Sequence, residues 1–333
     1  MINDEFFMTV RMLLGIALLL MASVAAADQQ HVLVVVGAEG TPEYGQTFNR
    51  WADQWKAAAA RGGAAFEIVG RTERGDDLVQ LQQKVAQAIQ TPSAEPLWLI
   101  LIGHGTFDGR TPRFNLRGPD LSAPAAAEML AGSQRPVAVI NGSSCSAPFI
   151  NALSGPNRIV MTGTKDGSEI QFTRFGGYIA DAVGNLDADI DRDGQTSLLE
   201  AWLYASNRTE EFYKSDGRLA TEHSLLDDSG DGKGTRAEVF EGVRIKDNVK
   251  NKAALDGKLA HRWHLVRSES ERSLTPEQRT TRDQLEGKLE KLRQTKTNYA
   301  EADYLRQLEE ILIPLAQLYE AAAVTNDKET ERN

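Results

Sequence analysis

His104 and Cys145 each follow a strongly apolar segment of the chain. His104 comes after the run 97–102, and Cys145 comes after the run 137–140 and four small or polar residues. A thiol can attack a carbonyl carbon once it gives up its proton, and an imidazole can accept that proton near neutral pH. The pair could therefore support nucleophilic catalysis, with the backbone N–H groups of Gly105 and Cys145 as candidate donors to an oxyanion.

Two other interpretations of Cys145 remain open. It is the only cysteine, so no intramolecular disulfide can form, and it could be an inert buried thiol in a binding or scaffold protein that retains the fold but is catalytically inactive. A serine hydrolase is the less favoured enzyme alternative, with residues 142–146 as an incomplete G-x-S-x-G elbow. That segment lacks the final glycine, and the histidine precedes it, which is the wrong chain order for an α/β-hydrolase.

An acidic loop over residues 189–200 matches the calcium loop of an EF-hand. Aspartates stand at positions 1, 3 and 5, a glycine at 6 and a glutamate at 12, which is the spacing that surrounds Ca²⁺ with oxygen atoms. The predicted ligands are Asp189, Asp191, Asp193, the Gln195 carbonyl, Ser197 and Glu200. A second, weaker candidate loop repeats part of the spacing with Asp227, Ser229, Asp231 and Glu238.

Strand and helix patterns alternate around these residues. Buried strands are predicted at 31–36, 64–69, 97–102, 137–140 and 158–161, and helices at 46–61, 78–89 and 125–130. This alternation predicts an α/β fold, a three-layer sandwich with a mostly parallel sheet. Because ligands bind at the carboxyl ends of strands in such sheets, His104 and Cys145 are expected at the same edge.

The two ends of the chain differ from this central part. Residues 1–27 contain an apolar run from Met12 to Ala27 that ends in three alanines, which predicts a secretory signal peptide, with an uncleaved anchor as the alternative. Residues 28–249 are expected to form the α/β domain. Residues 250–333 show leucine stripes at helical spacing, which predict a helical hairpin or short coiled coil that packs or forms a homodimer, with a kink at Pro314.

The charge distribution limits the partners. The formal net charge is −10, and residues 250–333 hold equal numbers of basic and acidic residues, so the acidic excess lies in the rest of the chain. An acidic body argues against nucleic acid, which binds basic patches. With the signal removed, no membrane association is expected, and the protein is predicted to be secreted or periplasmic.

The strand ending in His-Gly, followed by a strand ending in small residues and cysteine, resembles the caspase-like (clan CD) cysteine peptidases over roughly residues 31–185. The likeness is closest to the legumain and GPI-transamidase branch. It implies a cysteine endopeptidase with catalytic His104 and Cys145 and a protein or peptide substrate. Residues 162–169 resemble the loop that lines the P1 pocket, which implies substrate contacts from Thr164, Ser168 and Glu169.

The sequence departs from the legumain pattern at two places. Ser146 follows the cysteine where legumain has an acidic residue, and Glu43-Tyr44-Gly45 replaces Asn-Tyr-Arg in the first loop. Specificity for asparagine is therefore not implied. Glu43 is instead a candidate for substrate binding and for orienting His104.

Overall fold

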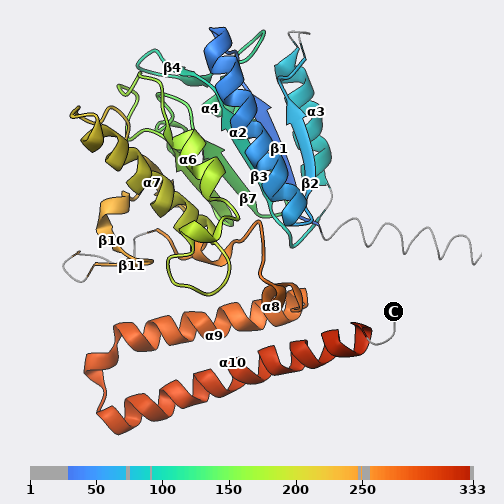
Figure 1. Ribbon diagram of the computed structural model, residues 1–333, viewed down its shortest axis with the longest axis vertical. Helices are drawn as coiled ribbons and strands as arrows, with labels where there is room; N and C mark the ends of the chain where they lie inside the picture. The colour runs from blue at the N-terminus through green and yellow to red at the C-terminus, as the bar shows by residue number, and fades with distance from the viewer. Residues whose placement is uncertain (1–28, 73–75, 91, 247–248, 250–255, 331–333) are drawn as a thin grey trace, which may run out of the picture. The chain divides into compact units, whose positions relative to one another are not determined.

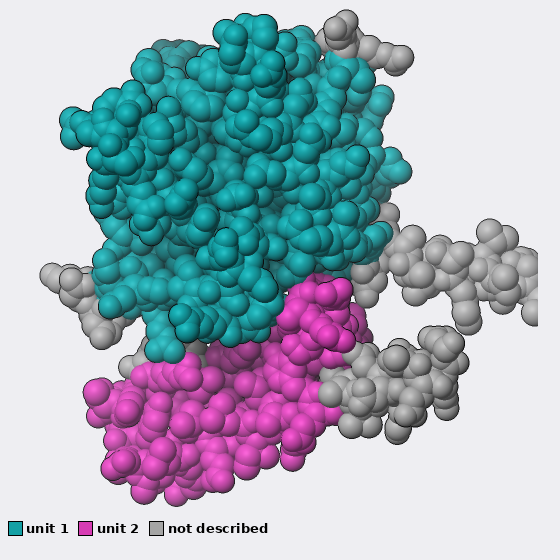
Figure 2. Space-filling model, viewed as in Figure 1, with its two compact units in different colours: residues 1–266 teal, residues 267–333 magenta. Residues whose placement is uncertain are grey.

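The computed structural model describes residues 29–72, 76–90, 92–246, 249 and 256–330. The predicted signal peptide lies outside the described residues. The chain divides into two compact units, residues 1–266 and 267–333, which Figure 2 colours separately. In the described part of the chain, no helix is long and apolar enough to cross a membrane.

The first unit is built on a six-stranded sheet in the order β2-β1-β3-β7-β8-β9 (Figure 1). The first five strands run parallel, and β9 pairs antiparallel to β8. This arrangement confirms the predicted α/β class with a mostly parallel sheet. The strands are β1 (His31–Val36), β2 (Ala65–Val69), β3 (Leu97–Ile102), β7 (Val137–Asn141), β8 (Arg158–Thr162) and β9 (Leu225–Asp227).

Helices cover both faces of this sheet (Figure 1) because alternate side chains of each central strand point to opposite faces. Val32 and Val34 join a core with Trp55, whereas Leu33 packs in a second core with Leu81. The first core includes α2 (Pro42–Arg61), α6 (Phe175–Ala182) and α7 (Leu198–Ser215). The second includes α3 (Asp77–Gln90), α4 (Ala123–Met129) and α5 (Phe149–Leu153).

A small antiparallel sheet follows His104 and was not predicted. It contains β4 (Gly105–Phe107), β5 (Pro112–Phe114) and β6 (Leu121–Ser122). The other short elements of the first unit are η1 (Leu186–Ala188), η2 (Ala237–Val239), β10 (Phe240–Glu241), β11 (Arg244–Ile245) and η4 (Ala260–Arg262).

The first unit extends beyond the predicted boundary at residues 249 and 250. The Gln30 side-chain amide donates to the carbonyls of His264 and Leu265, at 3.2 and 3.3 Å. The Asp256 carboxylate is buried and accepts the Asp228 N–H at 2.9 Å. These contacts attach residues 256–265 to the sheet unit, so the boundary falls after Val266.

The second unit is helical, as its leucine spacing predicts. It contains α8 (Glu269–Arg272), α9 (Pro276–Gln294), η5 (Lys296–Asn298) and α10 (Glu301–Thr330), and α10 continues through Pro314 without interruption. Thr275 and Gln278 form a capping box at the start of α9. The buried Arg282 of α9 pairs with Glu271 of α8.

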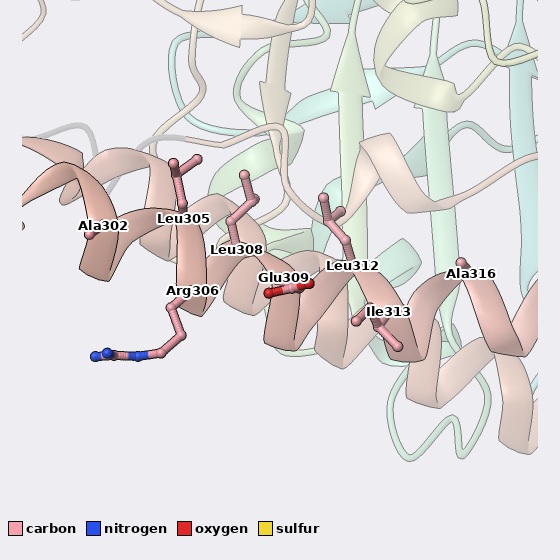
Figure 3. A pocket seen from close by; sticks show the side chains of 8 residues that line it. All are labelled: Ala302, Leu305, Arg306, Leu308, Glu309, Leu312, Ile313 and Ala316. Atoms are coloured by element: carbon pink, nitrogen blue, oxygen red, sulfur yellow. The ribbon is translucent and has the colours of Figure 1, made fainter.

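One side of α10 carries a groove of about 760 Å³ lined only by residues of this helix. Figure 3 shows Leu305, Leu308 and Leu312 projecting along it. Leu305 is 53% exposed and Leu312 is 41% exposed, so large apolar side chains remain in contact with solvent within this unit. We call Leu305, Leu308 and Leu312 the α10 leucine row.

Candidate active site

The loops that carry His104 and Cys145 touch each other at one edge of the sheet. Strands β3 and β7 are hydrogen-bonded neighbours, with Leu101 opposite Asn141. A Cβ atom on Gly105 would lie 2.2 Å from the Ser144 carbonyl oxygen. Only glycine allows this close approach, and it brings the residue after His104 against the residue before Cys145.

Cys145 occupies a strained backbone conformation at the end of β7. Its φ is 54°, in the left-handed region, which costs a residue with a side chain on the order of 1 kcal/mol. The turn is fixed from both sides. Asn141 Oδ1 accepts the Ser143 N–H and hydroxyl at 3.1 and 2.7 Å, and Ser146 Oγ lies 3.2 Å from Thr164 Oγ1. Strain of this kind persists where the surroundings impose it, which is common at functional sites.

The predicted oxyanion donors are already engaged in this structure. The Cys145 N–H donates to the Glu169 carbonyl at 3.0 Å. The Gly105 N–H points to Ser144 Oγ at 3.4 Å. The sequence could not show these partners, because they depend on how neighbouring loops meet. The loop after β8 supplies the partner of the Cys145 N–H, and the loop after β7 supplies that of the Gly105 N–H. As described, the site has no preformed oxyanion hole from these two groups.

His104 lies among aromatic side chains beside this turn. Its ring centroid is 4.8 Å from that of Tyr44 and 5.2 Å from that of Phe48. His104 Nε2 lies 3.3 Å from the Glu39 carbonyl oxygen. Because a carbonyl can only accept, Nε2 carries the proton, and Nδ1 of the neutral ring keeps its lone pair as a base. This backbone carbonyl is a site feature that sequence patterns do not reveal.

The prediction that Glu43 orients His104 is wrong. The partner of the ring is the carbonyl of Glu39, which precedes α2, whereas Glu43 is exposed in the first turn of that helix. Its own backbone N–H and the Thr41 hydroxyl lower the pKa of the Glu43 carboxyl.

Burial favours the neutral form of both His104 and Cys145. It lowers the pKa of His104, and it raises the pKa of Cys145, with a smaller contribution from the Asp166 carboxylate. The resting pair at neutral pH is therefore a neutral thiol and a neutral imidazole. Such a pair reacts when the imidazole removes the thiol proton as the nucleophile attacks.

The residues expected to bind substrate have structural partners instead. Thr164 is fully buried, and its hydroxyl accepts the Ala147 N–H at 3.1 Å. Ser168 is exposed and donates its hydroxyl to Asp166 at 2.5 Å. Glu169 is 9% exposed, and its Oε2 accepts the Lys165 N–H at 2.9 Å. These contacts shape the loop after β8, and none of these three side chains has a polar group that is both exposed and uncommitted.

His223 joins this loop and was missed in the sequence. Its backbone N–H donates to Glu169 Oε2 at 3.1 Å, and its ring Nδ1 contacts Glu169 Oε1. The two residues are 54 positions apart in the chain, and His223 lies outside every motif noted in the sequence, so spacing gave no signal for the contact. The contact links the segment before β9 to the loop after β8, whose Glu169 carbonyl accepts the Cys145 N–H.

The first acidic loop gathers three carboxylates. One oxygen from each of Asp189, Asp191 and Asp193 lies within 4.8 Å of the others. Asp189 also accepts the N–H groups of Asp193 and Gly194, at 3.2 and 3.0 Å, and Gly194 has the positive φ of 89° that this turn requires. Three carboxylates and nearby carbonyls form a donor set suited to a hard divalent cation.

The other predicted ligands of this loop serve a different purpose. Glu200 is buried, and its two oxygens accept the N–H groups of Ile190, Asp191 and Ser197. Ser197 caps α7 and forms a capping box with Glu200. Ser197 is therefore engaged in capping α7, and Glu200 joins the start of α7 to the loop backbone at Ile190 and Asp191.

The acidic residues of the second loop are less closely grouped. Within the described residues, only the aspartates of the first loop bring three candidate ligand atoms of carboxylate, imidazole or thiol groups together. Asp227 lies in β9 and accepts the N–H groups of Gly230 and Gly232, at 3.0 and 3.1 Å. Glu238 instead pairs with Arg236 at 2.8 Å. These hydrogen bonds shape the loop as a turn, and the weaker calcium prediction for it stays a prediction.

Comparisons with known proteins add little to these observations. No protein-family model matches the sequence, and no curated protein matches it. Solved structures similar to this chain include caspase-1 from Spodoptera frugiperda, with a TM-score of 0.38 and 7% identity over 61% of this chain and 87% of that one. The Drosophila initiator caspase Dronc has a TM-score of 0.38 and 10% identity, over 62% and 82%. These likenesses are too weak to place the chain in a family.

Proposed function

We propose that this protein is an exported cysteine endopeptidase that uses Cys145 as nucleophile and His104 as general base. The observation that carries the proposal is the strained left-handed Cys145 at a strand end, whose loop touches that of a histidine with Nδ1 free to act as a base. Export is proposed from the apolar run that ends at Ala27. The mature protein would then be secreted or periplasmic.

The proposed reaction follows from these two groups. Cys145 Sγ attacks the carbonyl carbon of a peptide bond while its proton moves to His104 Nδ1. The imidazolium then gives that proton to the leaving amine, and water hydrolyses the resulting thioester. The aromatic side chains around His104 limit solvent at the ring, and the Glu39 carbonyl fixes its orientation.

One observation favours the alternative of an inactive binding protein. Cys145 is only 2% exposed, and its N–H is bonded to Glu169. The serine-hydrolase alternative has less support, because Ser144, at the nucleophile position of that elbow, is buried and donates its hydroxyl to the Gly105 carbonyl at 3.4 Å. Covalent labelling of the thiol separates these functions.

We expect peptide acyloxymethyl ketones to label Cys145 in the full-length protein, with a preference that depends on the P1 side chain. Such a reagent needs both a nucleophilic thiol and a bound peptide. A catalytically inactive protein would therefore show no labelling that depends on the P1 residue. Mass spectrometry of the digested protein identifies the modified residue. Absence of labelling with every P1 variant, while iodoacetamide modifies the unfolded protein normally, would sink the peptidase proposal.

We also propose a calcium site in the first acidic loop. The ligands would be Asp189, Asp191, Asp193 and the Gln195 carbonyl, with water completing the shell of oxygen atoms. The support is the close approach of three carboxylates, which repel one another unless a cation lies between them.

We further propose that the α10 leucine row pairs with a second copy of the chain. Leu305 and Leu312 of the row are exposed to solvent, and Leu308 between them is partly buried. A two-fold axis near Leu308 would set the row against the same row of the other copy, which makes the interface self-complementary. Arg306 projects away from the row and pairs with Asp303 of its own helix, so it does not oppose this contact.

Light scattering on the full chain is expected to give the mass of a dimer. Replacing both Leu305 and Leu312 with aspartate should return a monomer, because the buried apolar surface provides most of the association energy. Leu186→Asp is the matched control, because this leucine is 62% exposed in the first unit. A monomeric wild type at micromolar concentration would refute the interface.

A further inference from the structure

A second histidine, His223, anchors the loop after β8, which in turn bonds to Cys145. Glu169 provides two different contacts: its carbonyl accepts the Cys145 N–H at 3.0 Å, and its carboxylate bonds to His223. Because a carboxylate only accepts, His223 Nδ1 is the donor to Oε1. His223 thus reaches the nucleophile through a single intervening residue.

The segment around His223 is itself rigidly attached. Its neighbour Glu222 is buried, and Glu222 Oε2 accepts the N–H groups of Arg174 and Phe175, at 2.7 and 3.0 Å, at the start of α6. Tyr213 of α7 donates its hydroxyl to Glu222 Oε1 at 3.1 Å. His223 therefore projects from a fixed point, which allows it to hold a loop in place.

We propose that His223 is a positioning residue that holds Cys145 in its strained turn by fixing Glu169. The proposal rests on the proposed peptidase function for its kinetic readout, and a second readout does not depend on that function. A left-handed cysteine relaxes unless its surroundings hold it. The loop after β8 holds this turn through the bonds of Thr164 to Ser146 and Ala147, and the bond from the Cys145 N–H to Glu169 is the one made by the strained residue itself. Loss of the His223 ring leaves Glu169 Oε1 with only the more exposed Lys165 ammonium, at 3.6 Å, while the two backbone N–H donors remain on Oε2.

The geometry distinguishes three substitutions. In asparagine, the donor nitrogen is attached to Cγ, as Nδ1 is in histidine, so His223→Asn retains the bond to Glu169. In His223→Gln the nitrogen lies one bond further out, in the place of Nε2, which the Glu169 contact does not use. His223→Ala removes the donor. We expect kcat for peptide cleavage to fall about tenfold or more in the Ala and Gln variants, with KM within about twofold, and to remain within about threefold in the Asn variant.

The second readout is the alkylation of Cys145 by iodoacetamide in the folded protein. Cys145 is 2% exposed, so a loosened turn should react faster. We expect the rate to rise about tenfold or more in His223→Ala and His223→Gln and to stay at the wild-type value in His223→Asn. This measurement needs no substrate, so it tests the role of His223 even if the wild type cleaves nothing.

His31→Ala is the matched control, because His31 also pairs with a glutamate, Glu67, at 3.0 Å, but at the amino end of β1. It should leave both readouts unchanged. The proposal is overturned if His223→Ala matches the wild type in alkylation, or if His223→Asn behaves like His223→Ala. If the Ala variant does not fold, the comparison of Asn with Gln decides. A wild type without activity or peptide-directed labelling refutes the peptidase function but leaves the alkylation result to decide the role of His223.

Discussion

Cys145→Ala is expected to lower kcat/KM for peptide cleavage by about three orders of magnitude or more, and His104→Ala by a similar factor. The first variant lacks the atom that forms the covalent intermediate. The second lacks the base, and burial keeps the Cys145 thiol protonated near neutral pH unless a base removes its proton. Initial rates with a peptide that the wild type cleaves provide the measurement.

Glu43→Ala is the control for this pair of substitutions. Glu43 is exposed, and the His104 ring is held by the Glu39 carbonyl, so this variant should keep the wild-type kcat, and a contribution of Glu43 to substrate binding would change KM alone. Circular dichroism should show all three variants folded. Cleavage that survives in Cys145→Ala would assign the reaction to another residue.

Calcium is expected to raise the melting temperature of the wild type, and Asp191→Asn should abolish most of that rise. A ligand that binds only the folded state stabilises it by about 2.7 kcal/mol at one hundred times its Kd. Asp191 contributes one of the three clustered carboxylates, and asparagine preserves its shape while removing its charge. Thermal unfolding in millimolar calcium, compared with a chelator at equal ionic strength, gives the shift.

Asp187→Asn provides the matched control for calcium. Asp187 is exposed in η1, two residues before the cluster, and is not part of it. This variant should retain the full calcium-dependent rise in melting temperature. An equal rise in melting temperature in Asp191→Asn would mean that the stabilising ion binds elsewhere, or that general charge screening causes the rise.

The central sheet was predictable because its strands are buried on both faces. The runs at 31–36 and 97–102 are almost wholly apolar, and their bounds match β1 and β3. The strand β9 (Leu225–Asp227) was missed because it has three residues at the edge of the sheet and leads into an acidic turn. Helix α2 begins at Pro42, earlier than predicted, because a proline suits the first helical position; Thr41 precedes it in an extended conformation without a side-chain capping bond.

The candidate site was predictable only at the level of strand ends. The order of the strands explains why the loops of His104 and Cys145 touch. The partner of the Cys145 N–H could not be predicted, because it is the Glu169 backbone carbonyl on a separate loop. Glu200 shows a related limit, since a glutamate at the twelfth loop position is also the third residue of α7, where it completes a capping box.

The bonds from Gln30 to the carbonyls of His264 and Leu265 have a consequence for synthesis on the ribosome. Gln30 precedes β1, which lies between β2 and β3 in the sheet, so one of the first residues of the unit has partners among the last to be made. The Trp98 indole N–H also donates to the Gln30 side chain, at 2.9 Å, and ties β3 to the same junction. The sheet can begin to pair as its strands emerge, but this junction cannot close until Leu265 has left the exit tunnel. The first unit can therefore complete its fold only after the ribosome has begun to synthesise the helical segment that follows it.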